Sequence, residues 1–248
     1  MEQRRWTNLA LIMRCAQDMT VIVNPSGPFA YYKLDAGLTD IIGGRDAVQY
    51  PLAGGTPTFV AGGIIDNCLV SGPDIYCYCT GNDWALSTTI GFSARMWIKS
   101  TAKIACSVLV GANVSGILPA WAIFPNGANT RFYLDHFQKY VQKAATLSDG
   151  NWHMLIGIYD YANDTIRLVI DGISSAPVTV PKMIWTWGGS GLAGVGLTFG
   201  YNPTAFDNFL VDEIAIYKDH VLTTQEISDE WNGGNGRTWN GTTWIDGP

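Results

Sequence analysis

Hydrophobic and polar positions alternate most regularly in two neighbouring segments, residues 152–159 and 166–170. Both repeat with the two-residue period of a β-strand, in which successive side chains point to opposite faces. Residues 160–165 between them are rich in Asp and Asn, so we predict an antiparallel hairpin with a loop of about four to six residues. A hairpin alone is marginal in water, and we expect a second sheet to cover its apolar face. That face is predicted to consist of Trp152, Ile156, Ile158, Leu168 and Ile170.

Short β-rich segments bounded by Gly, Pro or Asn recur along the rest of the chain and indicate a meander of strands. The predicted strands are residues 31–35, 64–70, 75–79, 89–98, 104–110, 120–124, 131–134, 182–186, 195–200 and 208–217. Thr223 and Glu226 have the spacing of a capping box, so one short helix should follow and run to Trp231. The predicted fold class is therefore all-β, a two-sheet antiparallel sandwich with one short C-terminal helix. Its core is predicted to contain Trp97, Trp152, Ile156, Leu168, Ile170, Ile214 and Ile216.

Several sequence blocks resemble, in order, the motifs of laminin-G-like, concanavalin-A-like jelly-roll domains. The blocks are residues 31–35 (YYKLD), 92–99 (FSARMWIK), 149–153 (DGNWH), 168–172 (LVIDG), 211–217 (VDEIAIY) and 222–227 (LTTQEI). The block VDEIAIY is the most specific of them. The resemblance covers about residues 29–232 and implies one jelly-roll domain there. Outside it lie an N-terminal arm, residues 1–28, and a Gly- and Trp-rich tail, residues 233–248.

The composition narrows the range of partners. Charged residues make up only 15% of the 248 positions, while Gly (28), Trp (10) and Tyr (11) are plentiful, as expected of short strands joined by tight turns. The net charge is −6, and the 15 Lys and Arg residues are spread along the chain, which argues against a nucleic-acid partner. The apolar run at residues 9–13 is too short for a membrane span or a signal-peptide core, so we expect no membrane partner either.

The five cysteines are an odd number, which excludes complete pairing within the chain. Cys77 and Cys79 share one face of a predicted strand, and the three scattered histidines hardly supply the further ligands of a zinc site. We favour reduced, packed thiols over a metal site or a disulfide, which fits assembly in a reducing cytosol.

We assign no catalytic residue. Retaining glycosidases on this fold need a pair of carboxyls on one strand, and no such strand is present. The four glutamates are Glu2, Glu213, Glu226 and Glu230. Asp212 and Glu213 are adjacent, so on a regular strand they point to opposite faces. No Gly-x-Ser-x-Gly motif occurs, and His153 lies at a structural position of the resembled family. The sequence therefore predicts a protein that is not an enzyme.

Two kinds of ligand remain. Laminin-G-like domains often hold a calcium ion at the rim of the sandwich, and the matching carboxylates are Asp35, Asp66 and Asp212. A loop Asp also serves the turn itself, so the turn role remains the alternative to Ca²⁺. Carbohydrate would need exposed aromatic side chains with polar neighbours. The candidates are Trp185 and Trp187, which share a strand face beside a glycine loop, and Trp121.

Together with the resemblance, these patterns favour a non-enzymatic virion structural or interaction protein of a tailed bacteriophage. Such a subunit would serve as a capsid decoration, head fibre or tail-associated adhesin, assemble in the host cytoplasm and bind other virion subunits, further copies of itself or host surface glycans. The alternative is a carbohydrate-binding module of a bacterial surface or secreted protein. The apolar spacing of the N-terminal arm allows a short amphipathic helix, and the arm either packs on the domain edge or docks into a partner subunit. The predicted partner contacts are Trp6, Leu9, Ile12, Trp239 and Trp244.

Overall fold

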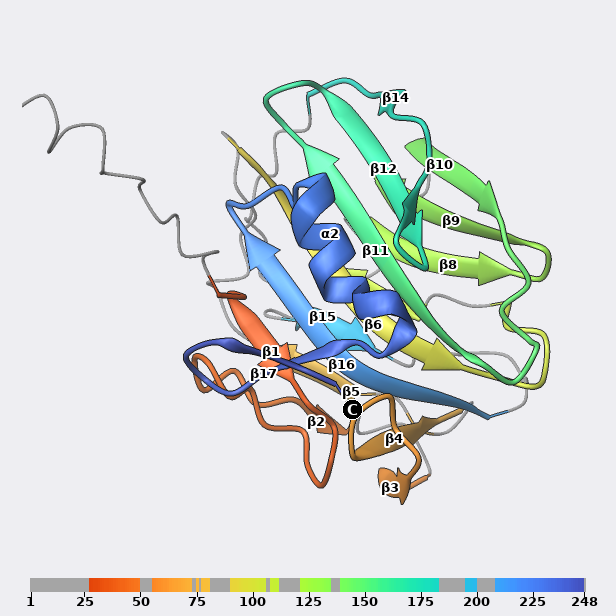
Figure 1. Ribbon diagram of the computed structural model, residues 1–248, viewed down its shortest axis with the longest axis vertical. Coiled ribbons are helices and arrows are strands. Elements are labelled where there is room, and N and C mark those ends of the chain that lie inside the picture. The colour runs from red at the N-terminus through yellow and green to blue at the C-terminus, as the bar shows by residue number, and fades with distance from the viewer. Residues whose placement is uncertain are drawn as a thin grey trace, which may run out of the picture.

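Two antiparallel β-sheets stack face to face, and one helix lies across the outside of the larger sheet (Figure 1). The computed structural model describes residues 27–49, 55–72, 75, 77–80, 90–105, 108–111, 121–134, 139–182, 195–199 and 208–247. The predicted all-β sandwich with one short C-terminal helix is confirmed. Among the described residues, no helix is long and apolar enough to cross a bilayer.

The larger sheet has nine strands and does not follow the predicted meander. Its main path runs through β13 (Ile173–Ser174), β12 (Thr165–Ile170), β11 (Trp152–Asp160), β6 (Gly91–Lys99), β16 (Phe209–Lys218), β4 (Asn67–Ser71) and β3 (Thr58–Ala61). Off this path, β1 (Ala30–Tyr32) pairs with β16, and β14 (Val178–Thr179) pairs with β12. Because β6 lies between β11 and β16, strands far apart in sequence are neighbours, as a jelly roll requires.

The smaller sheet has seven strands. Their order is β10 (Lys139–Ala144), β9 (Asn129–Leu134), β8 (Trp121–Asn126), β7 (Leu109–Gly111), β15 (Val195–Phe199), β5 (Cys77–Thr80) and β2 (Val48–Gln49). Here β8, β9 and β10 do form a local meander. The sequence did not predict β2 and β10 of this sheet, nor β3, β13 and β14 of the larger sheet. Most of the predicted strand at residues 182–186 lies outside the described residues.

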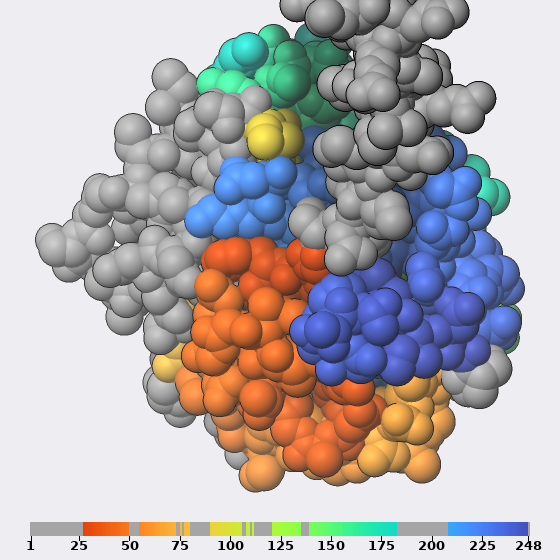
Figure 2. Space-filling view, turned by 60° about the vertical axis from the view of Figure 1, so that its left-hand side comes forward, coloured from red at the N-terminus to blue at the C-terminus, as the bar shows by residue number. Residues whose placement is uncertain are grey.

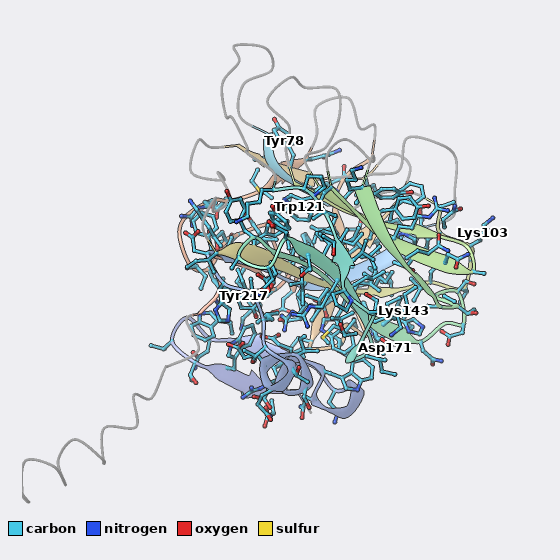
Figure 3. The ribbon with its side chains drawn as sticks, turned by 90° about the horizontal axis from the view of Figure 1, so that it is seen from above. Tyr78, Lys103, Trp121, Lys143, Asp171 and Tyr217 are labelled. Carbon is cyan, nitrogen blue, oxygen red and sulfur yellow. The ribbon has the colours of Figure 1, made fainter. Side chains whose placement is uncertain are left out.

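The predicted hairpin is confirmed as β11 and β12, joined by a turn at residues 161–164. The Asn163 backbone N–H donates to Asp160 Oδ1 at 3.0 Å, and Asp164 has a φ of 54°, the left-handed backbone that Asn and Asp tolerate. At the sandwich edge near this hairpin, Lys143 of β10 donates to the Ile170 carbonyl at 3.4 Å, so it links the two sheets (Figure 3).

The apolar residues of this hairpin do not all face the second sheet, which corrects the predicted face. Leu168 and Ile170 pack between the sheets, whereas Ile156 and Ile158 pack on the outer face of the larger sheet. The register explains the split, because Leu168 pairs with Gly157 and not with Ile156 or Ile158. Among the other predicted core residues, Ile214 and Ile216 lie between the sheets, Trp97 is buried on the outer face, and Trp152 is only half-buried there.

The outer face is covered by the C-terminal segment. This segment comprises α2 (Thr224–Trp231), η1 (Asn232–Gly234), β17 (Arg237–Trp239) and β18 (Trp244–Asp246). The predicted capping box is present, since the Glu226 N–H donates to Thr223 Oγ1 at 3.2 Å and the Thr223 N–H to Glu226 Oε2 at 2.7 Å. The indole of Trp231 stacks on Trp97 with ring centroids 5.3 Å apart. In Figure 2 the dark-blue C-terminal segment lies against the red and orange residues of the first described strands.

The described cysteines behave as predicted. Cys68, Cys77 and Cys79 are free and fully buried. Burial raises the pKa of each thiol to about 12, so these cysteines stay protonated and unreactive at neutral pH. Cys15 and Cys106 lie outside the described residues.

Candidate functional site

The solvent face of the smaller sheet carries a row of aromatic and polar side chains across three strands. On β8, β9 and β10, the members of this row alternate with residues that pack between the sheets, such as Ile123, Phe132 and Val141. We call the following set the aromatic row: Phe124, Arg131, Tyr133, Tyr140 and Gln142. The strand register sets Arg131 opposite both Phe124 and Gln142, and Tyr133 opposite Tyr140.

The rings of the aromatic row are in contact with one another. The ring centroids of Phe124 and Tyr133 lie 6.0 Å apart, and those of Tyr133 and Tyr140 lie 5.3 Å apart. Tyr133 is buried by its neighbours, whereas 47% of Tyr140 is exposed at the edge strand β10. Tyr140 therefore offers an aromatic surface to a ligand, and Tyr133 and Phe124 support it from the side.

Arg131 is held within this row by two hydrogen bonds. Its Nε donates to Gln142 Oε1 at 2.8 Å, and one terminal nitrogen donates to the Tyr133 hydroxyl, also at 2.8 Å. The guanidinium carbon lies 5.1 Å from the Tyr140 ring centroid. The hydrogen bond with Tyr133 raises the pKa of Arg131, so the group is a permanent cation. Flat exposed aromatic surface beside fixed polar donors is the composition of a site for a small polar ligand with an apolar face.

The three sequence-predicted ligand tryptophans do not belong to this row. Trp121 is 3% exposed and points into the core, where its ring lies 5.2 Å from Phe92 and 6.4 Å from Phe132 (Figure 3). The prediction of a solvent-facing Trp121 is therefore wrong, because its strand turns this position toward the other sheet. Trp185 and Trp187 lie outside the described residues.

The predicted calcium ligands serve the backbone in this structure. Asp212 accepts hydrogen bonds from the backbone N–H groups of Ile64 and Ile65, at 2.8 and 3.4 Å, and Asp35 accepts one from Asn67 at 3.3 Å. Asp66 is exposed and has a φ of 55°, as in a turn. Within the described part of the chain, these carboxyls do not gather into a group that could hold a metal ion. The turn role is thus seen, and calcium binding stays a prediction.

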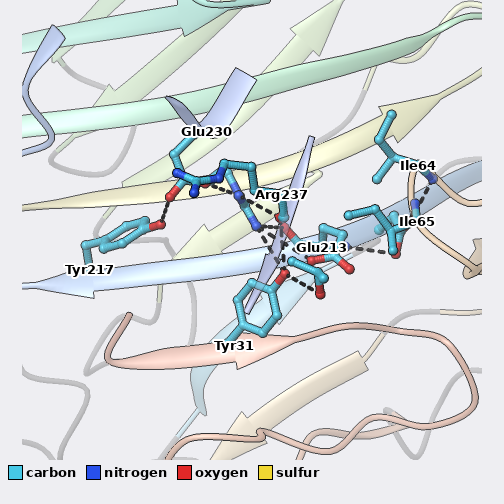
Figure 4. Close-up of polar contacts among 10 residues, drawn as sticks. Tyr31, Ile64, Ile65, Glu213, Tyr217, Glu230 and Arg237 are labelled. Atoms are coloured by element: carbon cyan, nitrogen blue, oxygen red, sulfur yellow. Dashed lines mark hydrogen bonds and ion pairs between the residues drawn. The ribbon is translucent and has the colours of Figure 1, made fainter. Parts of the chain in front are cut away.

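A second polar cluster is buried between the larger sheet and the C-terminal segment (Figure 4). Arg95 of β6 is fully buried and pairs with Glu230 of α2, and its other terminal nitrogen lies 3.8 Å from Glu213. Glu230 also accepts a hydrogen bond from the Tyr217 hydroxyl. Burial lowers the pKa of Arg95 to about 10 and raises that of Glu213 well above its usual range. This cluster ties α2 to the sheet.

A β-bulge overturns the expectation that Asp212 and Glu213 point to opposite faces. The register of β16 against β6 shifts between Asp212 and Ala215, and Glu213 has a φ of 48°. Asp212 pairs with Trp97 of the outer face, while Glu213 approaches Arg95 on that same face. Both carboxyls are fully buried, and burial raises the pKa of Asp212 to about 8. They cannot reach a substrate in solution.

The predicted partner contacts in the tail are partly used within the chain. Trp239 is 7% exposed and packs in the outer-face cluster, so the prediction that it contacts a partner is wrong. Trp244 is half-buried, with its ring centroid 5.2 Å from that of Trp239 and 5.5 Å from that of Tyr31. The glycine-rich tail shows no clear strand pattern, so the hairpin of β17 and β18 that carries these tryptophans was not predicted. Trp6, Leu9 and Ile12 lie outside the described residues.

With the fold and these sites described, comparison with known proteins identifies the family. A family model described as the concanavalin A-like lectin/glucanases superfamily matches residues 74–228. The chain belongs to this superfamily. The resemblance in fold drawn from the sequence blocks is confirmed, and no curated protein sequence matches.

Solved structures with the same fold include receptor-binding parts of neurotoxins. The binding domain of botulinum neurotoxin serotype D is 13% identical, with a TM-score of 0.59, over 84% of this chain and 52% of that one. The neurotoxin DC binding domain in complex with rat synaptotagmin II is 15% identical, with a TM-score of 0.61, over 84% and 51%. The same domain in complex with SialylT is 16% identical, with a TM-score of 0.60, over 85% and 52%. The present chain spans about half the length of these neurotoxin chains, and at such low sequence identity the likeness concerns the fold alone.

Sequence reasoning missed the aromatic row because it did not predict β10. A signal was available: Tyr140 and Gln142 alternate with Val141, which is buried. The charged residues Lys139 and Lys143 flank these positions and made the strand pattern hard to recognise. No pattern in a single strand reveals that Arg131 lies opposite Gln142, since that depends on pairing between strands.

Proposed function

We propose that this protein is a non-enzymatic binding module and that its aromatic row binds glycans. The observation that carries the proposal is the exposed ring of Tyr140, which packs against Tyr133 beside the polar groups of Arg131 and Gln142. The face of a pyranose ring that carries C–H bonds stacks on such rings, while its hydroxyls need hydrogen-bond partners in the plane of the sugar. The aromatic row supplies both an aromatic ring for stacking and polar groups for these hydrogen bonds.

Family membership and fold support this proposal. The superfamily contains lectins by its own description, and the neurotoxin structures with the same fold are binding domains. One was solved with SialylT, and entry of botulinum neurotoxin type C into cells depends on interaction with two ganglioside molecules. These facts belong to those proteins. For the present chain they make glycans the first ligand class to test.

A glycan array tests the proposal directly. The whole protein should bind at least one class of glycan, and Tyr140→Ala should reduce that binding by about tenfold or more, because the stacking surface is lost. Ile173→Ala removes an apolar side chain that is 66% exposed, from the edge of the other sheet, and should leave binding unchanged. Absence of binding across the array, or equal binding by the Tyr140→Ala protein, would overturn the proposal.

The proposal that the protein is not an enzyme rests on the burial and the partners of two glutamates. Glu213 is fully buried, and Glu230 is 4% exposed and engaged by Arg95 and Tyr217. Neither lies on the aromatic row. Incubation of the protein with the glycans that it binds should therefore release no reducing ends. Hydrolysis that is lost on substituting Glu213 or Glu230 would contradict this expectation.

We also propose that the module is a virion subunit assembled in a host cytoplasm, with other subunits as partners. The observation that favours this role is the burial of three reduced thiols, Cys68, Cys77 and Cys79, which fits folding in a reducing compartment. The N-terminal arm would supply docking contacts. Mass spectrometry of purified particles should detect the protein in stoichiometric amounts, whereas its recovery only from the medium or cell surface would favour the carbohydrate-binding module of a bacterial protein.

A further inference from the structure

We infer that the aromatic row selects acidic glycans, those whose sugar rings carry a carboxylate, with Arg131 as the residue that recognises the charge. This inference rests on the proposed function and adds the class of ligand to it. It also gives two neighbouring residues different roles: Tyr140 stacks on the sugar ring, and Arg131 binds the carboxylate.

The first step is that some N–H groups of Arg131 form no hydrogen bond with the described residues. A guanidinium has five N–H groups in a planar fork, and the two hydrogen bonds of Arg131, to Gln142 and to the Tyr133 hydroxyl, use two of them. Its second terminal nitrogen forms no hydrogen bond with another described residue. The remaining N–H groups can therefore form the paired hydrogen bonds that a carboxylate accepts from an arginine.

The second step is that no carboxylate of the described chain neutralises this cation. Arg45 pairs with Asp40, Arg95 with Glu230, and Arg237 with Asp246. Arg131 has only uncharged partners among the described residues, although the chain has 21 acidic residues and a net charge of −6. An acidic protein that leaves this arginine without an acid presents a local site complementary to an anion.

The third step is that the guanidinium is already ordered before a ligand arrives. Hydrogen bonds fix it from two sides, and the rings of Tyr133 and Tyr140 lie 6.0 and 5.1 Å from its central carbon. A free arginine side chain loses rotamer freedom on binding, and this loss weakens the affinity for the ligand. Arg131 has lost most of that freedom in the folded protein. It is thus preorganised for a ligand.

The guanidinium also borders the exposed ring. Its central carbon lies 5.1 Å from the Tyr140 ring centroid, so a sugar bound on that ring has the cation beside it. A sugar that stacks on the exposed half of Tyr140 can therefore place its carboxylate against the free edge of Arg131. A neutral sugar would stack equally well but would provide no negative charge for the cation.

The test compares matched acidic and neutral ligands on the intact protein. Oligogalacturonate and its methyl ester share ring, linkage and stacking surface, and sialyllactose and its methyl ester form a second pair. Isothermal titration should show the acidic member of at least one pair binding about 10- to 100-fold more tightly, the range expected for hydrogen bonds to a charged group. Arg131→Gln should lower the affinity for the acid to that for its neutral partner. Arg131→Lys, which keeps the charge without the planar fork, should fall between them.

Lys182→Gln is the control for net charge. It removes one positive charge from an exposed position near Asp164, away from the aromatic row, and should leave the acidic preference unchanged. Circular dichroism and melting of each variant establish that it is folded. Equal binding of acidic and neutral glycans, with loss of both on Tyr140→Ala, would overturn the acidic selectivity and leave glycan binding intact. Binding of neither class would overturn both proposals, and an acidic preference that survives Arg131→Gln would exclude Arg131 as its source.

Discussion

At the scale of single residues, Gly157 of β11 packs tightly against Phe132 of the opposite sheet. A Cβ atom at this position would lie 2.4 Å from the Phe132 ring of β9. Gly157→Ala should therefore force the sheets apart locally and cost about 1 to 3 kcal/mol of unfolding free energy, measured by urea titration. Gly37→Ala is the matched control, since its nearest neighbour would be 3.9 Å away. Equal effects of the two substitutions would mean that the sheets are not in contact at Gly157.

His153 should make stability depend on pH. Its Nδ1 lies 2.8 Å from Asp171 and its Nε2 lies 3.0 Å from Asp149. The hydrogen bond with Asp171, followed by that with Asp149, raises the pKa of His153 above its ordinary value of 6.5. A raised folded-state pKa stabilises the protein below the unfolded pKa, and this contribution disappears as pH rises through the folded value.

The predicted consequence is that His153→Gln costs more unfolding free energy at about pH 5.5 than at about pH 8.5. Urea titrations of both proteins at the two pH values measure the difference. The mutation keeps a polar side chain of similar reach, so loss of packing contributes equally at both values. A cost that does not change with pH would show that the imidazole stays neutral between its two carboxylates.

At the scale of elements, α2 is fastened to the larger sheet by a buried charge pair. Glu230→Gln would leave Arg95 as a buried cation without its main partner, which costs about 3 to 5 kcal/mol in comparable cases. Thermal and urea unfolding should both detect the loss. The neighbouring Asp229 is exposed, so Asp229→Asn should change the unfolding free energy by less than about 0.5 kcal/mol. If Glu230→Gln changed the unfolding free energy as little as Asp229→Asn does, water would replace the carboxylate beside Arg95.

At the scale of the whole molecule, the two ends of the chain should behave differently. Deletion of residues 237–248 removes Trp239 and Trp244 from the outer-face cluster, so we expect a markedly lower melting temperature. Deletion of residues 1–26 should leave melting unchanged and abolish assembly with partners. Differential scanning calorimetry and size-exclusion chromatography separate these effects. If both deletions lower the melting temperature equally, the N-terminal arm is also part of the domain's own packing.

The sequence by itself determined the local elements and the family. The alternation at residues 152–159 and 166–170, the Asp- and Asn-rich turn and the capping box of Thr223 and Glu226 all rest on interactions between residues near one another in the chain. Such interactions act in the same way in any surrounding, which is why they could be predicted. The family blocks added the expectation of a jelly roll.

Only the tertiary structure decided which face each strand turns inward and what covers the other face. Eight of the nine residues of β6 are buried, because its inner face meets the second sheet and its outer face meets the C-terminal segment. A strand covered on both sides is apolar on both, so its period of two no longer distinguishes inside from outside. Arg95 illustrates the same point: its partner Glu230 lies 135 positions away. The aromatic row likewise exists only because pairing between β8, β9 and β10 brings its side chains together, and contacts of that range are not encoded in any local pattern.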